Sequence, residues 1–483
     1  MLARKGEKVM QVQDIIDPSQ DPSGIMSEFV ADLKYEDLPG EQVDFIKRDI
    51  LDCLGVMIAG SGHEVVRKTM EVIRQWAPAG SGKGRVVLYG DSLPPIVSAF
   101  ANGTIARICD LGDAHQFGGH ITEWVVPALL SALPLAEGKV SGKEFITAFA
   151  AGAEWGIREQ TNYQLQNHIK DTPGECGGNR FATGAIAKLL GLNKEQIWAA
   201  QGIAYEINPI GEQQKYNEGV PTMFLQHGYA CSNAIKSVTL ARNGLTGVKG
   251  IYMGLGGQLK IMKWDCIGPD FLTKDLGKEW VWMDDTMKAF AGCKYSHPTM
   301  YGVLRMMGQH QFTWQDIQTI DFTVSSGCRV TLDPHETKWN PSNQHEAVFS
   351  NPYSVAYAAV YGDLTILAFQ DEEVRKNMAN PEFKALMDHI TYTVDPQAVP
   401  HPFEGYRMHM VLKDGREINH VESDVPGNPR NPMTWEQVKR KFMVGTKISA
   451  VDLGNDRYEK IMSFCEHMDE AEDMNELMEL LVP

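Results

Sequence analysis

The chain has 483 residues, of which 43% are hydrophobic and 22% charged, and its formal net charge is -17. This length and composition are typical of a globular protein with two or more domains, and the acidic balance argues against nucleic acid or an anionic membrane as a partner. No apolar run approaches the roughly 18 residues of a membrane span, and residues 1–24 lack the apolar segment of a secretory signal, so we expect a cytoplasmic protein.

The first part of the chain, residues 26–275, predicts helix after helix. Local signals support two of the helix starts, because Ser141 with Glu144 and Asn193 with Gln196 have the spacing of capping boxes. Examples of the expected helices are 41–58, 96–109, 125–136, 142–157, 180–190, 194–205 and 225–243.

After about Met287 the pattern changes to that of an α+β segment. Three stretches favour β-branched or aromatic residues and alternate as strands do, and residues 413–416 (KDGR) predict a tight hairpin before a fourth strand. The expected strands are 317–324, 390–394, 406–412 and 418–421, and helices are expected at 299–309, 352–361 and 371–378. The tail from Pro432 is helical again, so the sequence predicts a mainly α protein with an inserted α+β segment.

The densest polar cluster is Asp110-Leu-Gly-Asp113-Ala-His115-Gln-Phe-Gly-Gly-His120. It follows an apolar helix and contains glycines, and a loop of this kind can aim several side chains into one cavity. The carboxylates are suited to orienting the imidazoles, which exchange protons near neutral pH. The alternative interpretation is a solvated loop in which an aspartate caps the next helix.

The same cluster also suits a metal site, since Asp and His are common ligands, but its spacing matches no established metal motif. The eight cysteines contain no CxxC pair, which favours reduced thiols over disulfides or a zinc site. We therefore expect no metal and no cofactor. Gly177-Gly178-Asn179-Arg180 opens a helix where backbone N–H groups can bind an anion, although the strand of a nucleotide-binding motif is missing.

A second constellation, Lys288-Ala-Phe-Ala-Gly-Cys293-Lys294-Tyr295-Ser296-His297, lies where the helical pattern gives way to the α+β pattern. Boundaries between domains favour active-site clefts. His297 is a candidate acid or base, and Lys294 a candidate partner for a substrate carboxylate. A structural histidine in a loop is the alternative.

Several short motifs, in order over nearly the whole chain, resemble the MmgE/PrpD family. They are Ala101-Asn-Gly-Thr104 with Asp110-Leu-Gly-Asp113, Val126-Pro-Ala-Leu-Leu130 after His120, Ser141-Gly-Lys-Glu-Phe145, Lys188-Leu-Leu-Gly-Leu192, Arg242-Asn-Gly-Leu-Thr-Gly247, Lys288 to His297, Leu412-Lys-Asp-Gly-Arg416 and Gly427-Asn-Pro-Arg-Asn-Pro432. The family includes 2-methylcitrate dehydratase, cis-aconitate decarboxylase and iminodisuccinate epimerase.

The resemblance implies a large all-helical domain formed by both chain ends (residues 1–286 and 426–483), a smaller α+β lid (287–425) and a homodimer. It also implies a metal-free site between helical domain and lid, with the family's catalytic aspartate and histidines at Asp110, His120 and His297. We expect six further residues to bind substrate, namely Asp113, His115, Arg180, Lys294, Lys215 and Met223.

The chain also departs from the family pattern. Ile121 follows His120 where the family commonly has proline, and Met223 stands where some decarboxylases carry lysine. A further family histidine has no clean counterpart, with Thr172 nearest by spacing and His168 or Cys176 as substitutes in a remodelled loop.

We therefore predict a cofactor-independent lyase that acts next to the carboxylate of a small di- or tricarboxylic acid by dehydration or decarboxylation. His120 and His297 share the roles of acid and base, in an order that the sequence does not give, Asp110 orients His120, and Lys294 or Arg180 holds a carboxylate. The alternatives are an epimerase or isomerase of a small carboxylic acid, a degenerate member that only binds a metabolite, and a metal-dependent hydrolase.

Overall fold

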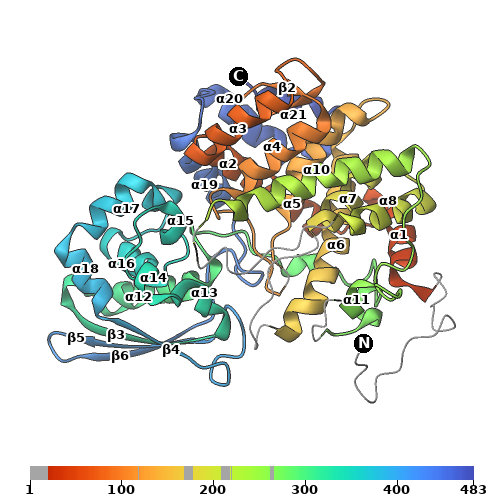
Figure 1. The fold of residues 1–483 in the computed structure, drawn as a ribbon. Coiled ribbons are helices and arrows are strands. Elements are labelled where there is room, and N and C mark those ends of the chain that lie inside the picture. The colour runs from red at the N-terminus through yellow and green to blue at the C-terminus, as the bar shows by residue number, and fades with distance from the viewer. Residues whose placement is uncertain (1–19, 118, 168–177, 208–217, 219, 262–265) are drawn as a thin grey trace, which may run out of the picture.

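The computed structural model describes residues 20–117, 119–167, 178–207, 218, 220–261 and 266–483. The fold is mainly α-helical, as predicted, and its elements gather into two parts (Figure 1). The helical part contains α1 (Pro22–Asp32), α2 (Gly40–Ser61), α3 (Glu64–Trp76), α4 (Pro95–Arg107), α5 (Thr122–Ala132), α6 (Gly142–Asn167), α7 (Gly178–Leu189), α8 (Lys194–Glu206), α10 (Thr222–Arg242), α11 (Gln258–Ile261), α19 (Trp435–Gly445), α20 (Asn455–Glu466) and α21 (Asn475–Leu480). A short hairpin of β1 (Gly84–Arg85) and β2 (Ser92–Leu93) lies beside α4.

The second, α+β part contains one sheet and the helices beside it. Its helices are α12 (His297–His310), α13 (Arg329–Leu332), α14 (His335–Lys338), α15 (Gln344–Ala347), α16 (Asn351–Tyr361), α17 (Asp371–Met378) and α18 (Pro381–Asp388). Its strands are β3 (Ile317–Val324), β4 (Ile390–Val394), β5 (Tyr406–Leu412) and β6 (Glu417–Glu422), in the order β4-β3-β5-β6. β3 pairs parallel with β4 and antiparallel with β5, which pairs antiparallel with β6 across the predicted hairpin. All four predicted strands are therefore present.

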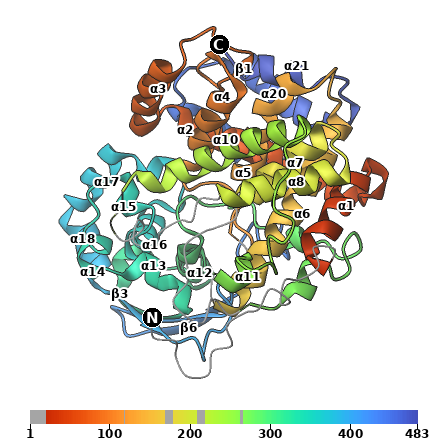
Figure 2. The ribbon, with the colours of Figure 1, turned by 45° about the vertical axis from the view of Figure 1, so that its right-hand side comes forward.

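Both ends of the chain build the helical part. The C-terminal helices α19 and α20 pack on α2, whose residues are almost all buried, and Figure 2 shows them beside the N-terminal helices. The approach is close, because a Cβ atom at Gly55 would lie 3.0 Å from the backbone of Phe442. The C-terminal helices therefore pack on the N-terminal ones, while the predicted domain boundaries at residues 287 and 425 stay predictions.

The crossing of α4 and α10 matters most for the site. A Cβ atom on Gly103 would lie 2.7 Å from the carbonyl oxygen of His227, and one on Gly228 would lie 2.5 Å from the Thr104 hydroxyl. Only glycine permits such backbone contact without displacement. These two glycines therefore bring the start of α10, with His227, against the last turns of α4.

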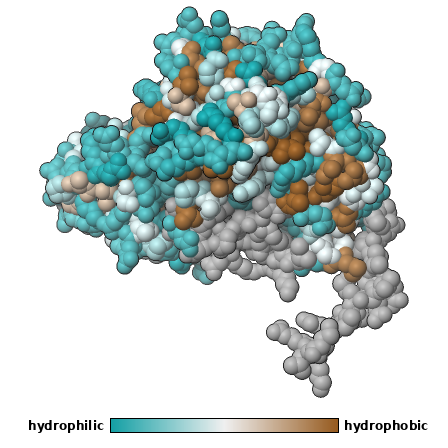
Figure 3. All heavy atoms as spheres, turned by 45° about the horizontal axis from the view of Figure 1, so that its top comes forward, coloured by the Kyte–Doolittle hydropathy of each residue, from teal (hydrophilic) through white to brown (hydrophobic). Residues whose placement is uncertain are grey.

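No helix among the described residues is long and apolar enough to cross a membrane. Apolar side chains nevertheless gather in patches on the face shown in Figure 3. The large exposed apolar residues include Trp76, Tyr229 and Leu240, with exposed fractions of 59%, 49% and 40%. The rings of Trp76 and Tyr229 both contact the buried ring of Phe100, with centroids 5.5 and 5.0 Å away, so α3 and α10 present two exposed aromatic side chains over α4.

Candidate active site

Asp110 lies at the centre of a buried charge cluster just beyond the end of α4. Its φ is 47°, a left-handed conformation that aspartate tolerates better than most residues. The carboxylate forms an ion pair with Arg107, and Lys288 Nζ lies 3.4 Å from Asp110 Oδ1 and donates to the Asp110 carbonyl at 3.1 Å. Burial opposes ionisation, but Lys288, Arg107 and His120 together hold the pKa of Asp110 below its usual range. Asp110 is therefore a permanent anion between two cations.

Asp113 fixes the start of α5 and thereby positions His120. Its carboxylate accepts hydrogen bonds from the backbone N–H groups of Ile121 and Thr122, at 2.6 and 3.0 Å, and from the Thr122 hydroxyl. Its carbonyl oxygen lies 2.5 Å from Nδ1 of His120. Because a carbonyl can only accept, Nδ1 carries the proton and the neutral imidazole presents the lone pair of Nε2.

His115 holds the same loop through backbone contacts. Its Nε2 lies 2.8 Å from the Val281 carbonyl, and its Nδ1 accepts from the N–H of Phe117 at 3.1 Å. A bridge between His115 and Gly119 closes the loop on itself. Asp113 and His115 were predicted to bind substrate, and the contacts that the structure gives them hold the loop.

His297 and Lys294 approach the loop from the start of α12. Burial, aided by Lys288 and Lys294, lowers the pKa of His297 to about 3, so the ring is neutral near pH 7. Lys294 Nζ donates to the Ala114 carbonyl at 2.8 Å and to the Thr286 hydroxyl at 2.7 Å. Burial also lowers the pKa of Lys294, to about 7. Asp110 interacts electrostatically with both His120 and His297.

The remaining predicted binding residues lie elsewhere in the described chain or outside it. Arg180 is fully buried, and its Nε donates to Glu159 Oε2 at 3.1 Å. These partners belong to the packing of α6 and α7. Met223 is buried in the first turn of α10. Lys215 lies outside the described residues, as do His168, Thr172 and Cys176.

Two residues that the sequence analysis gave no role, Glu123 and His227, lie beside His120. Glu123 Oε2 is 3.8 Å from His120 Nδ1 and 3.7 Å from His227 Nδ1. The His227 ring stacks on Trp124 with centroids 3.4 Å apart. The i, i+3 spacing of His120 and Glu123 at a helix start was a usable signal. No local signal marks His227, since α10 reaches the site only through its crossing with α4.

Two further buried carboxyl groups, those of Asp49 and Asp285, lie near Asp113 of the loop. Asp49 and Asp285 are fully buried, and none of their oxygens has a hydrogen-bond partner among the described residues. Burial, together with nearby carboxylates such as Asp113, raises the pKa of both well above the ordinary value of 3.8. Within the described ranges, no group of three or more His, Cys, Asp or Glu side chains is arranged to hold a metal ion.

Replacing Asp49 with asparagine is expected to stabilise the protein as the pH rises. The folded pKa lies above 3.8, so this carboxyl's contribution to stability is fully present below pH 3.8 and is lost as the pH rises through the folded pKa. Between pH 3.8 and the folded pKa of Asp49, the free energy of unfolding of Asp49→Asn should rise relative to that of the wild type by up to about 1.4 kcal/mol per pH unit. Urea unfolding at a series of pH values measures this. The exposed control Glu459→Gln should track the wild type, and parallel curves for Asp49→Asn would contradict the prediction.

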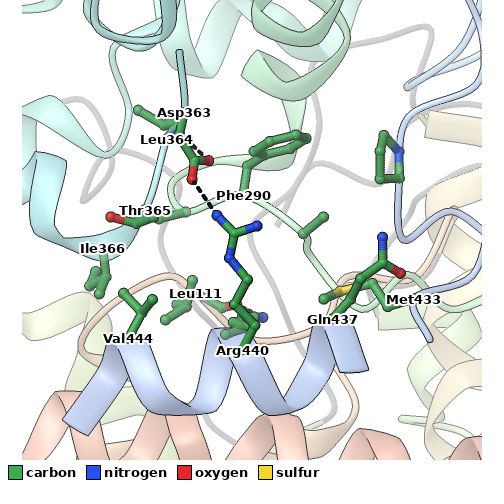
Figure 4. Close-up of a pocket in the computed structure, with 14 residues that line it drawn as sticks. Leu111, Phe290, Asp363, Leu364, Thr365, Ile366, Met433, Gln437, Arg440 and Val444 are labelled. Atoms are coloured by element: carbon green, nitrogen blue, oxygen red, sulfur yellow. Dashed lines mark hydrogen bonds and ion pairs between the residues drawn. The ribbon is translucent and has the colours of Figure 1, made fainter. Parts of the chain in front are cut away.

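A crevice of about 190 Å³ adjoins the site where α19 meets the α+β part (Figure 4). Leu111, next to Asp110, lines it, and so does Phe290, whose ring lies edge-on 5.9 Å from the His297 ring. Its basic groups are engaged, since Arg440 pairs with Asp363 at 3.5 Å and Lys441 pairs with Asp52 at 2.7 Å. The Arg440 pair joins α19 to the α+β part and the Lys441 pair joins it to α2, while Lys441 Nζ also donates to the Leu111 carbonyl, in the loop after α4, at 2.9 Å.

The fold is thus that of a mainly helical protein with an α+β part, and comparison with known proteins names its family. The family model described as MmgE/PrpD N-terminal domain matches residues 24–264, and the MmgE/PrpD C-terminal domain matches residues 290–458. The chain therefore belongs to the MmgE/PrpD family.

Curated relatives match along nearly their whole length. A cis-aconitate decarboxylase of Aspergillus terreus is 25% identical, over 95% of this chain and 96% of the relative. Cis-aconitate decarboxylase of Mus musculus is 25% identical, over 90% of this chain and 88% of the relative. The cis-aconitate decarboxylase-like protein oryM of Aspergillus oryzae is 23% identical, over 96% of this chain and 98% of the relative.

Proposed function

We propose that this protein is a cofactor-independent lyase that dehydrates or decarboxylates a small di- or tricarboxylic acid. The observation that carries the proposal is His120, whose Nδ1 is held on the Asp113 carbonyl so that Nε2 is the basic atom. A buried imidazole fixed in one tautomer is suited to general base catalysis. The names of the relatives, which are decarboxylases of a tricarboxylic acid, support the substrate class.

In dehydration, Nε2 of His120 takes the proton from the carbon next to a substrate carboxylate, the bond from the neighbouring carbon to its hydroxyl breaks, and the hydroxyl takes up a proton from solvent and departs as water. In decarboxylation, Nε2 of His120 takes the proton of the leaving carboxyl group, the carbon–carbon bond to that group breaks, carbon dioxide departs, and the imidazole returns the same proton to the carbon. His297 is neutral near pH 7, so it stabilises the developing anion by donating a hydrogen bond and not by a positive charge. Lys288 and Lys294 supply positive charge for substrate carboxylates.

Proton NMR of the purified protein in D2O tests this proposal. The panel consists of hydroxy-, amino- and unsaturated di- and tricarboxylates. New vinyl signals, or loss of a carboxyl group with deuterium at the adjacent carbon, support a lyase. Deuterium exchange with inversion and no loss of atoms would instead identify an epimerase. Silence across the panel from folded protein would contradict catalysis on this class, and thermal stabilisation by a panel member would then indicate a binding protein.

We also propose that the protein is a homodimer in the cytoplasm. The exposed aromatic side chains of Trp76 and Tyr229 support self-association, because exposed apolar patches commonly mark protein interfaces. Light scattering after size-exclusion chromatography should give twice the mass of the 53.8 kDa chain.

A further inference from the structure

Glu123 is a buried carboxylate that the proposed reaction does not yet use. It occupies the first turn of α5, and its side chain is fully buried. Neither of its oxygens has a hydrogen-bond partner among the described residues. A buried charge without hydrogen bonds is costly, so its retention beside the catalytic loop calls for a role.

Three nitrogen-bearing groups from three different elements surround this carboxylate. Arg107 Nη1, from α4, lies 3.6 Å from Glu123 Oε2. His120 Nδ1, from the loop, lies at 3.8 Å, and His227 Nδ1, from α10, lies at 3.7 Å. The two imidazole rings are 6.1 Å apart, edge to face, so the carboxylate lies within ion-pair distance of both.

The charges around Glu123 determine how it affects the proton affinity of the His120 and His227 imidazoles. Arg107 and Lys288 are cations, and Asp110, Asp113 and Glu123 are the carboxylates near them. Of these carboxylates, Glu123 lies within 4 Å of both His120 and His227, so its negative charge favours a proton on either imidazole. Burial raises the pKa of Glu123, while Arg107, His120 and Lys288 oppose the rise.

His227 is held firmly in this position. Its ring stacks on Trp124 at an interplanar angle of 16°, and Trp124 follows Glu123 directly in α5. The Gly103 contact with the His227 carbonyl fixes the backbone on the other side. The stacking partner of the ring therefore belongs to α5, the helix whose start lies directly after His120.

We propose that Glu123 is a positioning residue that couples His120 to His227, so that the two imidazoles act as one proton-carrying pair. This proposal rests on the proposed function, in which His120 takes a proton. After proton abstraction, the positive charge formed on His120 is balanced by the Glu123 carboxylate. His227 then provides a third imidazole of the site, in addition to His120 and His297.

The test is an NMR titration of histidine side chains in full-length protein labelled with 15N-histidine, comparing wild type with Glu123→Gln. Removing a negative charge less than 4 Å from both rings should lower the pKa of His120 and of His227 together, by about 1 unit or more. The variants His120→Gln and His227→Gln assign the two resonances. This readout needs no turnover, so it stands apart from the test of the proposed function.

The control is Glu154→Gln, which makes the same change at another fully buried carboxylate. Glu154 pairs with Arg158 and has no histidine among its partners in the described chain. It should leave both histidine resonances unchanged. If Glu123→Gln does not fold, Glu123→Asp retains the charge and should keep the two titrations coupled.

If a substrate is found, the acid limb of the pH profile of kcat/KM should shift to lower pH in Glu123→Gln, with turnover reduced about 10-fold or more and KM little changed. The proposal is overturned if both histidines titrate in folded Glu123→Gln as they do in the wild type. It is also overturned if only one of the two rings responds, since coupling requires both.

Discussion

Replacing His120 with alanine is expected to lower turnover at least about 100-fold, because it removes the general base. The fixed Nδ1 contact with the Asp113 carbonyl leaves Nε2 as the atom that exchanges the proton. His297→Ala should cause a loss of similar size, because it removes the imidazole that lies at the start of α12 and is influenced by the charge of Lys288. Initial rates with the substrate found by NMR measure both effects, with KM determined separately.

His310→Ala is the matched control, since His310 is the exposed last residue of the same helix as His297. It should keep nearly full activity. Near-full activity in both His120→Ala and His297→Ala would remove these residues from the mechanism, whereas an equal loss in His310→Ala would point to damage to the fold.

Replacing Arg180 with methionine is expected to lower the free energy of unfolding by about 3–5 kcal/mol, because it leaves a buried carboxylate without its partner. Arg180 and Glu159 are both fully buried, and their side chains lie 3.1 Å apart. Glu159 also accepts from Tyr252 at 2.7 Å and from Gln258 at 2.9 Å, so the pair anchors a network between α6 and the following segments. Urea unfolding followed by circular dichroism gives the change.

The control is Arg242→Met, which breaks the ion pair with the largely exposed Glu137. Exposed pairs contribute about 0–1 kcal/mol, so this variant should remain close to wild type. An Arg180→Met protein that unfolds like the wild type, but binds substrate more weakly, would restore Arg180 to the substrate site where the sequence analysis placed it.

Local sequence signals predicted most of the secondary structure. The capping boxes at Asn193 and at Ser141 both form the hydrogen bonds expected of them. The alternation in 317–324 gives a strand with those bounds. The helix α3 (Glu64–Trp76) and most of α1 fall within the stretch predicted as helix after helix, although neither was given bounds of its own. The helix α18 was not predicted.

The candidate site was only partly predictable. The loop from Asp110 to His120 and the segment ending at His297 stood out because their chemistry is concentrated in a few neighbouring residues. Arg180 was given a substrate role on the same reasoning, but its partner Glu159 is 21 residues away in sequence and only packing brings the two together. The assignment of catalytic roles to Asp110, His120 and His297 stays a prediction until the variants are measured.

The sequence by itself determined the helical and strand segments, the family and the short polar motifs, since these depend on periodicity and on residues close together in the chain. The tertiary structure alone decided which charges meet. Lys288 reaches Asp110 across 178 residues, and His227 reaches Glu123 because Gly103 and Gly228 let two helix backbones touch. Electrostatic interactions depend on distance in space and on burial, and neither can be read from separation along the chain.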